Sequence, residues 1–274
     1  MGTGTSLATD KPPAVVTAAV MANAVYTAPT SIDPIPLASV ANAAFTKTIE
    51  LERNLVGNSG NIKVAWYLKD KTLFIAYSGT RDLEFWLYNY DTDVKNKYGV
   101  KLHEGFLKLA EEVHQQIKHL LFEASWVRDP GKVNRVIHCG HSAGGAVAGI
   151  MPILNFLSPG KNQIIIDFGT PRYLSSCNNK YPFFRIRFQE YYDLVPCAPL
   201  KWRGPLPGFC HHGYPIYSTP NHKLKTEKPS RWLRPLKMAY KYGAALARQR
   251  PLTEVFKHHS MDDYAASVVT HFSS

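Results

Sequence analysis

The sequence predicts an α/β fold with a mostly parallel central sheet that helices cover on both faces. Strand-like and helix-like segments alternate along the chain, the arrangement that generates such sheets. One run, Leu73–Tyr77, is continuously apolar, as expected for a central parallel strand that is buried on both faces. A length of 274 residues suits one domain with a substantial core. We therefore expect residues 1–274 to form a single domain, with residues 1–10 as a loose tail.

The first half of the chain is expected to supply helices and three strands. Pro12 and Pro13 can open an N-terminal helix, because proline is tolerated in a first helical turn. Ile49–Leu51 and Ile62–Tyr67 alternate as half-buried strands and precede the apolar strand named above. The spacing of apolar residues then predicts a helix from His103 to Phe122.

The second half continues the alternation. Val133–Cys139 is a strand-like run that leads into a helix-like segment, Ala146–Met151. Two further strands are expected at Gln163–Phe168 and Phe183–Phe188. An amphipathic helix follows the residues around His258 at the C-terminal end.

The charge of the chain limits its partners. The formal net charge is +11, and residues 223–257 hold ten Lys and Arg against Glu227 and Glu254. Such an excess suits an anionic membrane surface, nucleic acid or simple solubility. The chain has no zinc-finger or RNP-like motif, and aromatic residues do not alternate with the basic ones. We therefore expect no nucleic-acid partner.

The chain shows no targeting or metal-binding pattern. It has no run of eighteen apolar residues and no basic leader followed by an apolar stretch, which favours a cytoplasmic or peripheral-membrane location. The cysteines lack metal-ligand spacing, and no metal or cofactor is expected. Cys139 should be buried in its strand, while a disulfide among Cys177, Cys197 and Cys210 stays open.

The most informative motif is Gly-x-Ser-x-Gly at Gly140–Gly144. It lies between a β-branched strand and an apolar helix, the context that predicts a nucleophile elbow. The sharp turn strains the backbone of Ser142, and Gly140 and Gly144 avoid collisions with neighbouring backbone. The Ser142 hydroxyl would then lie at a helix N-terminus, where backbone N–H groups favour a developing oxyanion.

An elbow serine requires a base to accept its proton and an acid to orient that base, and in this arrangement both follow the serine. Asp193, directly after the strand Phe183–Phe188, is the favoured acid. Glu190 and Asp167 are its rivals, and Asp193 would otherwise cap a turn. The downstream histidines are His211, His212, His222, His258, His259 and His271. We favour His259, just before the C-terminal helix, with His258 as the alternative.

An oxyanion hole requires two N–H donors. Ala143, after the nucleophile, would supply one, and Thr80, after the strand Leu73–Tyr77, would supply the other. The following connector is unusually aromatic and contains Phe85, Trp86 and Leu87.

From about residue 60 to 265 the chain resembles the class 3 lipase family of α/β-hydrolases. Gly140–Gly145 matches the family's Gly-His-Ser-Leu-Gly-Gly with Ala143 in place of Leu, and Asp193–Pro196 matches Asp-x-Val-Pro. Ser78 stands where the family usually has arginine, and Asn89 where an aspartate is usual. The other matching segments are Ala76–Thr80, Glu84–Leu87, His103–Phe106, Phe168–Arg172, His211–Gly213 and His259–Tyr264.

The resemblance implies an ester-cleaving enzyme with Ser142, Asp193 and His259 as its catalytic triad. It also implies a lid at Phe85, Trp86 and Leu87, unless these side chains simply pack on the domain. We therefore expect a serine hydrolase that cleaves lipid esters through an acyl-enzyme on Ser142, as an acylglycerol lipase or as a related phospholipase or carboxylesterase. The alternative is a catalytically silent, lipase-like scaffold that binds a partner or an anionic membrane through the basic segment 223–257.

Overall fold

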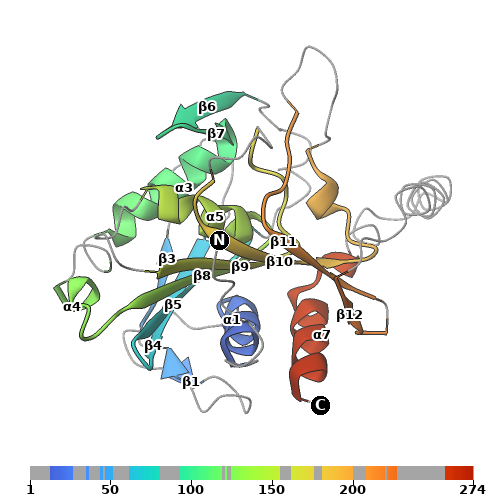
Figure 1. The fold of residues 1–274 in the computed structure, drawn as a ribbon, viewed down its shortest axis with the longest axis horizontal. Coiled ribbons are helices and arrows are strands. Elements are labelled where there is room, and N and C mark those ends of the chain that lie inside the picture. The colour runs from blue at the N-terminus through green and yellow to red at the C-terminus, as the bar shows by residue number, and fades with distance from the viewer. Residues whose placement is uncertain are drawn as a thin grey trace, which may run out of the picture.

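A computed structural model describes the fold (Figure 1). The described residues are 13–26, 35–36, 44–45, 47–51, 62–80, 93–118, 121, 125–154, 162–175, 181–199, 208–219, 221–226 and 257–273. Three expectations fall outside them: the tail at residues 1–10, the lid at Phe85, Trp86 and Leu87, and most of the basic segment 223–257.

An eight-stranded sheet forms the centre of the molecule, in the order β12-β11-β10-β9-β8-β5-β4-β3. Neighbours from β11 to β5 are parallel, whereas β12, β4 and β3 pair antiparallel with their neighbours. The strands are β3 (Lys47–Leu51), β4 (Ile62–Lys69), β5 (Thr72–Tyr77), β8 (Arg135–His141), β9 (Asn162–Phe168), β10 (Phe184–Glu190), β11 (Tyr214–Ser218) and β12 (Leu224–Lys225). The predicted fold class is confirmed, with β5 parallel to β8 on one side and antiparallel to β4 on the other.

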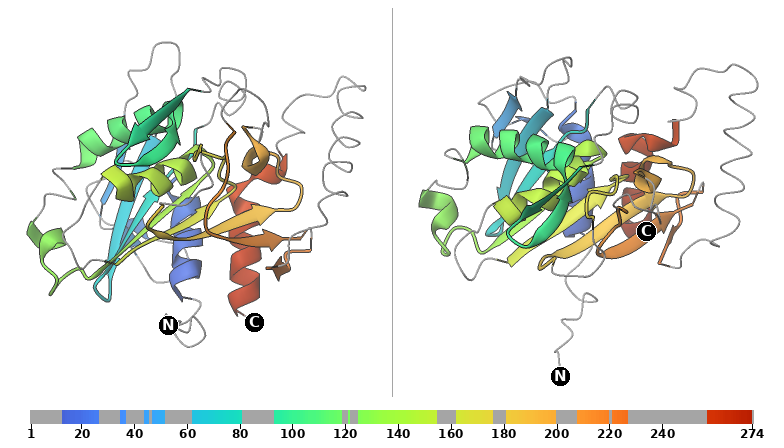
Figure 2. Two further views of the ribbon diagram at one scale, coloured as in Figure 1. Left: turned by 45° about the horizontal axis from the view of Figure 1, so that its top comes forward. Right: turned by 90° about the horizontal axis from the view of Figure 1, so that it is seen from above.

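Helices cover both faces of this sheet (Figures 1 and 2). The helices α1 (Pro13–Ala24) and α7 (Met261–Ser273) lie side by side on one face, and α3 (Glu104–Ile117) and α5 (Ala143–Leu154) lie on the other. Alternate side chains of β5 pack on opposite faces of the sheet. Leu73 and Ile75 pack in the core under α3 and α5, while Phe74 and Ala76 pack in the core under α1 and α7. Burial on both faces explains why this strand is apolar throughout.

Several elements differ from the sequence-based expectation. The helix α3 ends at Ile117 rather than continuing to Phe122. A hairpin of β6 (Val94–Lys97) and β7 (Val100–His103) precedes it and was not expected. Its Tyr98–Gly99 turn has positive φ at both residues, as a tight two-residue hairpin requires. The remaining short elements are β1 (Ile35–Pro36), β2 (Ala44–Phe45), α4 (Ser125–Arg128) and the 3₁₀ turns Val195–Cys197 and Lys257–His259.

The cysteines fall into two classes. Cys139 is a buried free thiol in β8, as expected from its place in that strand, and Cys197 is also free. Cys210 is disulfide-bonded. Among the described helices, none is both long and apolar enough to span a membrane.

Candidate active site

The predicted elbow lies where β8 ends and α5 begins. Ser142 has a φ of 57°, a left-handed conformation that is strained for a residue with a side chain. Its N–H donates to the carbonyl of Phe168 at 3.0 Å, which ties the turn to the end of β9. A Cβ at Gly144 would collide with the carbonyl oxygens of Tyr77 and Ser78 at the end of β5. The glycine is therefore required by the close approach of two backbones, as the motif predicted.

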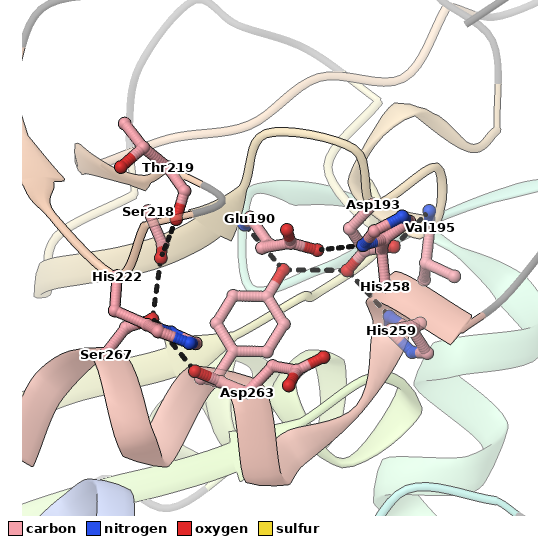
Figure 3. A network of polar contacts seen from close by, with 11 residues as sticks. Glu190, Asp193, Val195, Ser218, Thr219, His222, His258, His259, Asp263 and Ser267 are labelled. Carbon is pink, nitrogen blue, oxygen red and sulfur yellow. Dashed lines mark hydrogen bonds and ion pairs between the residues drawn. The ribbon is translucent and has the colours of Figure 1, made fainter. Parts of the chain in front are cut away.

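Asp193 and His259 lie in contact although they are far apart in the sequence (Figure 3). Asp193 occupies the turn after β10, and His259 ends the 3₁₀ turn Lys257–His259 that leads into α7. The His259 Nδ1–H donates to Asp193 Oδ2 at 2.7 Å. Because Nδ1 carries the proton, Nε2 of a neutral His259 is left with the lone pair that a general base needs.

Further donors hold the Asp193 carboxylate. The Tyr264 hydroxyl donates to Asp193 Oδ2 at 2.7 Å and accepts from the N–H of Glu190 at 2.8 Å. The N–H of Val195 donates to Asp193 Oδ1 at 2.9 Å. Burial, and then the charge of Asp193, raises the pKa of Tyr264 well above its usual value, so this hydroxyl remains a donor at all working pH values. Both carboxylate oxygens are thus fixed in place.

Ser142 and His259 lie in the same part of the site, but no hydrogen bond joins them. Ser142 Oγ and His259 Nε2 are both buried, and neither has a hydrogen-bond partner within the part of the chain that the structure describes. The rings of His141 and His259 lie 4.4 Å apart between centroids. A Cβ at Gly169, which follows Phe168, would lie 2.9 Å from Asp193 Oδ2 and 2.9 Å from His259 Cε1. A hydrogen bond between a nucleophile and its base is often long or unformed before a substrate is bound.

The loop after β5 lies against the elbow. Ser78 anchors it to β4: its N–H donates to the Lys63 carbonyl at 2.9 Å, and its Oγ accepts from the Lys63 N–H at 2.8 Å. Ser78, which stands where class 3 lipases usually have arginine, therefore holds the loop by two hydrogen bonds to the backbone of Lys63. Thr80 is buried, and its Oγ1 has no partner among the described residues. Ala143 is the first residue of α5, where backbone N–H groups lack intrahelical acceptors.

Tyr26, just after α1, connects this loop to the elbow. Its hydroxyl accepts from the Gly79 N–H at 2.8 Å and lies 2.7 Å from His141 Nδ1, to which it can donate its proton. Burial, followed by the charge of His259, lowers the pKa of His141 well below its usual value. His141 is therefore neutral and does not compete with its neighbour for a proton.

The rival candidates have other partners. Asp167 forms two hydrogen bonds with the Arg185 guanidinium, and Glu190 pairs with His258. His211 Nε2 lies 2.6 Å from the Pro196 carbonyl, and His222 Nδ1 lies 2.9 Å from Ser267 Oγ. No group of metal-binding side chains occurs among the described residues.

Part of the chain is similar to a known protein family. Residues 74–202 match the family model of class 3 lipases. This segment, slightly less than half of the chain, is therefore similar to class 3 lipases. The matched residues contain the elbow, the loop after β5 and Asp193. No curated protein matched the chain.

Solved structures show the same α/β-hydrolase fold. The Rhizomucor miehei triacylglyceride lipase has a TM-score of 0.59 at 21% identity, with 76% of this chain and 80% of that chain covered. The lipase of Rhizopus microsporus var. chinensis has a TM-score of 0.57 at 22% identity, with coverages of 80% and 75%. A triacylglycerol lipase described as having a serine protease triad at its catalytic centre has a TM-score of 0.56 at 21% identity, with coverages of 74% and 78%.

Two tyrosines of this candidate site were given no role from the sequence. Tyr264 lies in the motif that begins at His259, but its contact with Asp193 arises from the packing of α7 beside β10. Tyr26 precedes the elbow by more than a hundred residues, and no local pattern marks it. The place of Tyr264 early in the helix that follows His259 is a signal that could have found the first, whereas the second depends on tertiary structure alone.

Proposed function

We propose that the protein is a serine hydrolase that cleaves carboxylic esters of lipids, with Ser142 as nucleophile, His259 as general base and Asp193 as the acid that orients it. The observation that carries the proposal is the Asp193–His259 hydrogen bond beside an elbow serine. It leaves Nε2 of His259 as the proton acceptor within a buried, preorganised site.

The reaction would proceed through an acyl-enzyme. Ser142 Oγ attacks the ester carbonyl carbon while its proton passes to His259 Nε2. The tetrahedral intermediate collapses, the carbon–oxygen bond to the alcohol breaks, and His259 returns the proton to the leaving alcohol. Water then attacks the acyl-enzyme by the same route and releases the carboxylic acid. Asp193 stabilises the imidazolium that forms in both steps.

The oxyanion of each intermediate would bind to the N–H groups of Ala143 and Thr80. Ala143 N–H belongs to the first turn of α5, whose dipole favours negative charge. The Thr80 Oγ1, buried and without a partner in the described residues, offers a further donor. Removing one such donor typically costs about 3 kcal/mol of transition-state stabilisation.

Lipid esters are the substrate class that the family supports best. Residues 74–202 match the family model of class 3 lipases, and the structural neighbours of the chain include triacylglycerol lipases. A lid formed by Phe85, Trp86 and Leu87 remains a prediction. It would make activity rise steeply once the substrate forms an interface.

The proposal is tested by hydrolysis of p-nitrophenyl butyrate and p-nitrophenyl palmitate by the wild type and Ser142→Ala. We expect the wild type to hydrolyse at least one ester, and the substitution to lower kcat by at least about 10⁴-fold, because it removes the nucleophile. The ratio of the two rates distinguishes a short-chain esterase from a lipase.

Ser175→Ala is the matched control, because it makes the same chemical change at a serine outside the site and should leave both rates unchanged. A folded wild type that is inactive on both esters, on emulsified acylglycerol and on phospholipid would contradict the proposal. That result would favour the silent scaffold instead.

A further inference from the structure

A second carboxylate–histidine pair lies beside Asp193 and His259. His258 Nδ1 lies 3.4 Å from Glu190 Oε2, with side-chain exposures of 22% and 7% (Figure 3). The ring of Tyr192 packs 5.3 Å from that of His258 between centroids. The sequence had offered Glu190 as a rival acid and His258 as a rival base, and the structure pairs them with each other.

The two pairs connect the same two segments of the chain. Glu190 is the last residue of β10, and the N–H of Asp193 donates to its carbonyl at 3.2 Å. His258 and His259 are consecutive in the 3₁₀ turn before α7. Each pair therefore joins the end of β10 to this turn, so the turn is held at two adjacent points. The N–H of Glu190 also donates to the Tyr264 hydroxyl that holds Asp193.

We propose that Glu190 and His258 form a positioning pair that orients the turn carrying His259 and balances the charge beside it. The inference rests on the proposed role of His259 as the general base. When His258 is protonated, the pair is neutral as a whole, because one positive and one negative charge lie in contact. Neutralising either member leaves a single charge beside the Asp193–His259 pair, and that charge changes how readily His259 holds a proton.

Other ionisable groups among the described residues also face this turn. His259 faces Asp193 from the turn after β10, the neutral His141 from the end of β8, and Tyr264 from α7. Asp262 and Asp263 lie in the first turn of α7, and Asp262 accepts a hydrogen bond from Asn23 at 2.9 Å. Glu190 and protonated His258 add one negative and one positive charge to this set. Removing either charge should therefore shift the pH dependence of ester hydrolysis.

The test compares His258→Gln, Glu190→Gln and the double variant in ester hydrolysis across pH. His258→Gln keeps a polar side chain beside Glu190 but leaves the negative charge of Glu190 unbalanced. It should move the acid limb of the kcat/KM profile to higher pH by about half a pH unit. Glu190→Gln leaves the positive charge of His258 and should move the limb to lower pH. The double variant should return it to within about 0.2 pH unit of the wild type.

The same variants separate orientation from binding. Because the pair touches no substrate, each single substitution should lower kcat by about 3- to 10-fold and change KM by less than about 2-fold. Glu111→Gln is the control: it removes one carboxylate, on α3, that pairs with Lys97 of β6, and it should leave the acid limb of the profile unmoved. A uniform loss of kcat with a stationary limb, or shifts of the two singles in the same direction, would overturn the proposal.

A second measurement does not depend on turnover. In the Ser142→Ala background, the midpoint of the His259 imidazole NMR titration should rise with His258→Gln and fall with Glu190→Gln. Failure of the wild type to hydrolyse any ester would refute the proposed function while leaving this titration as the test of the pair. Unmoved midpoints in folded variants would refute the pair even in an active enzyme.

Discussion

Two buried carboxylates, one within β9 and one just beyond the neighbouring strand β10, show how the partner of a side chain decides its role. Asp167 is 0% exposed within β9, and Asp193 is 1% exposed in the turn beyond β10. Asp167 accepts from Arg185 Nε at 2.5 Å and from Nη2 at 3.1 Å. Asp193 accepts from His259 and Tyr264. An arginine never releases its proton, so the first pair can only stabilise structure, whereas a histidine can exchange one during a reaction.

The difference also depends on position along the strand. Asp167 lies inside β9, paired in register with Arg187 of β10, so its side chain is confined to one face of the sheet. Asp193 lies after its strand and just before the 3₁₀ turn Val195–Cys197, where its carboxylate contacts Tyr264 of α7. Residues beyond the carboxyl ends of parallel strands gather at one edge, and sites of α/β folds are found there.

The largest effect should follow Asp193→Asn. An amide at this position can stabilise the wrong tautomer of His259 and cannot stabilise an imidazolium, so kcat should fall by about 10⁴-fold. Urea unfolding should show that the variant remains folded. A kcat within tenfold of the wild type would show that Asp193 is not the orienting acid.

Asp167→Asn should act on stability instead. It leaves the buried Arg185 charge without its carboxylate, so the free energy of unfolding should fall by about 3–5 kcal/mol in urea titrations. The rate per folded molecule, counted with a fluorophosphonate that labels Ser142, should change little. Adding Arg185→Met removes the uncompensated charge and should recover part of the loss. A variant that keeps its stability but loses turnover would reverse the assignments of the two carboxylates.

His138 is a third buried polar side chain, and its hydrogen-bond partners are neutral rather than charged. His138 lies between the Tyr77 hydroxyl, 3.1 Å from Nδ1, and Gln163 Oε1, 3.1 Å from Nε2. Burial lowers its pKa from 6.5 to about 4, against the smaller opposing effect of the Gln163 hydrogen bond. The unfolded chain therefore binds this proton at higher pH than the folded one, so stability is complete above pH 6.5 and declines as the pH falls toward 4.

The shift at His138 corresponds to about 3 kcal/mol lost across that interval. Urea unfolding at several pH values should show a steeper acid decline for the wild type than for His138→Gln, which has no group that titrates there. His141 and His211, whose pKa values burial also lowers, contribute to both proteins equally. Parallel declines would mean that His138 is not the group that is protonated.

Local patterns predicted the parts of the fold in which sequence and burial agree. The apolar β5, the strands β8, β9 and β10 and the elbow follow from alternation and from glycine spacing. The hairpin β6–β7 was not predicted, because its polar residues Lys95, Asn96 and Lys97 show no apolar periodicity. The helix ending at Ile117 was extended too far, because the apolar residues Leu120, Leu121 and Phe122 continue the pattern beyond it.

The sequence could place Asp193 and His259 in one candidate site, but it could not indicate the contacts that distant helices add. Asp193 and His259 were selected from their places in the chain, and the structure brings them to 2.7 Å. The contacts of Tyr26 and the pairing of Glu190 with His258 depend on how α1 and the turn before α7 dock on the sheet. Such contacts join residues far apart in sequence, and no short-range periodicity encodes them.

The contacts of the Tyr26 hydroxyl limit how far the chain can be truncated without losing part of the candidate site. The segment that matches the class 3 lipase model, residues 74–202, begins after Tyr26 and ends before His259. A fragment trimmed to those limits would keep Ser142 and Asp193 but would lack both the tyrosine that braces the Gly79 peptide and the histidine. A fragment that keeps the whole candidate site must therefore extend from α1 to α7, so expression boundaries, fusion points and tags should be placed outside both helices.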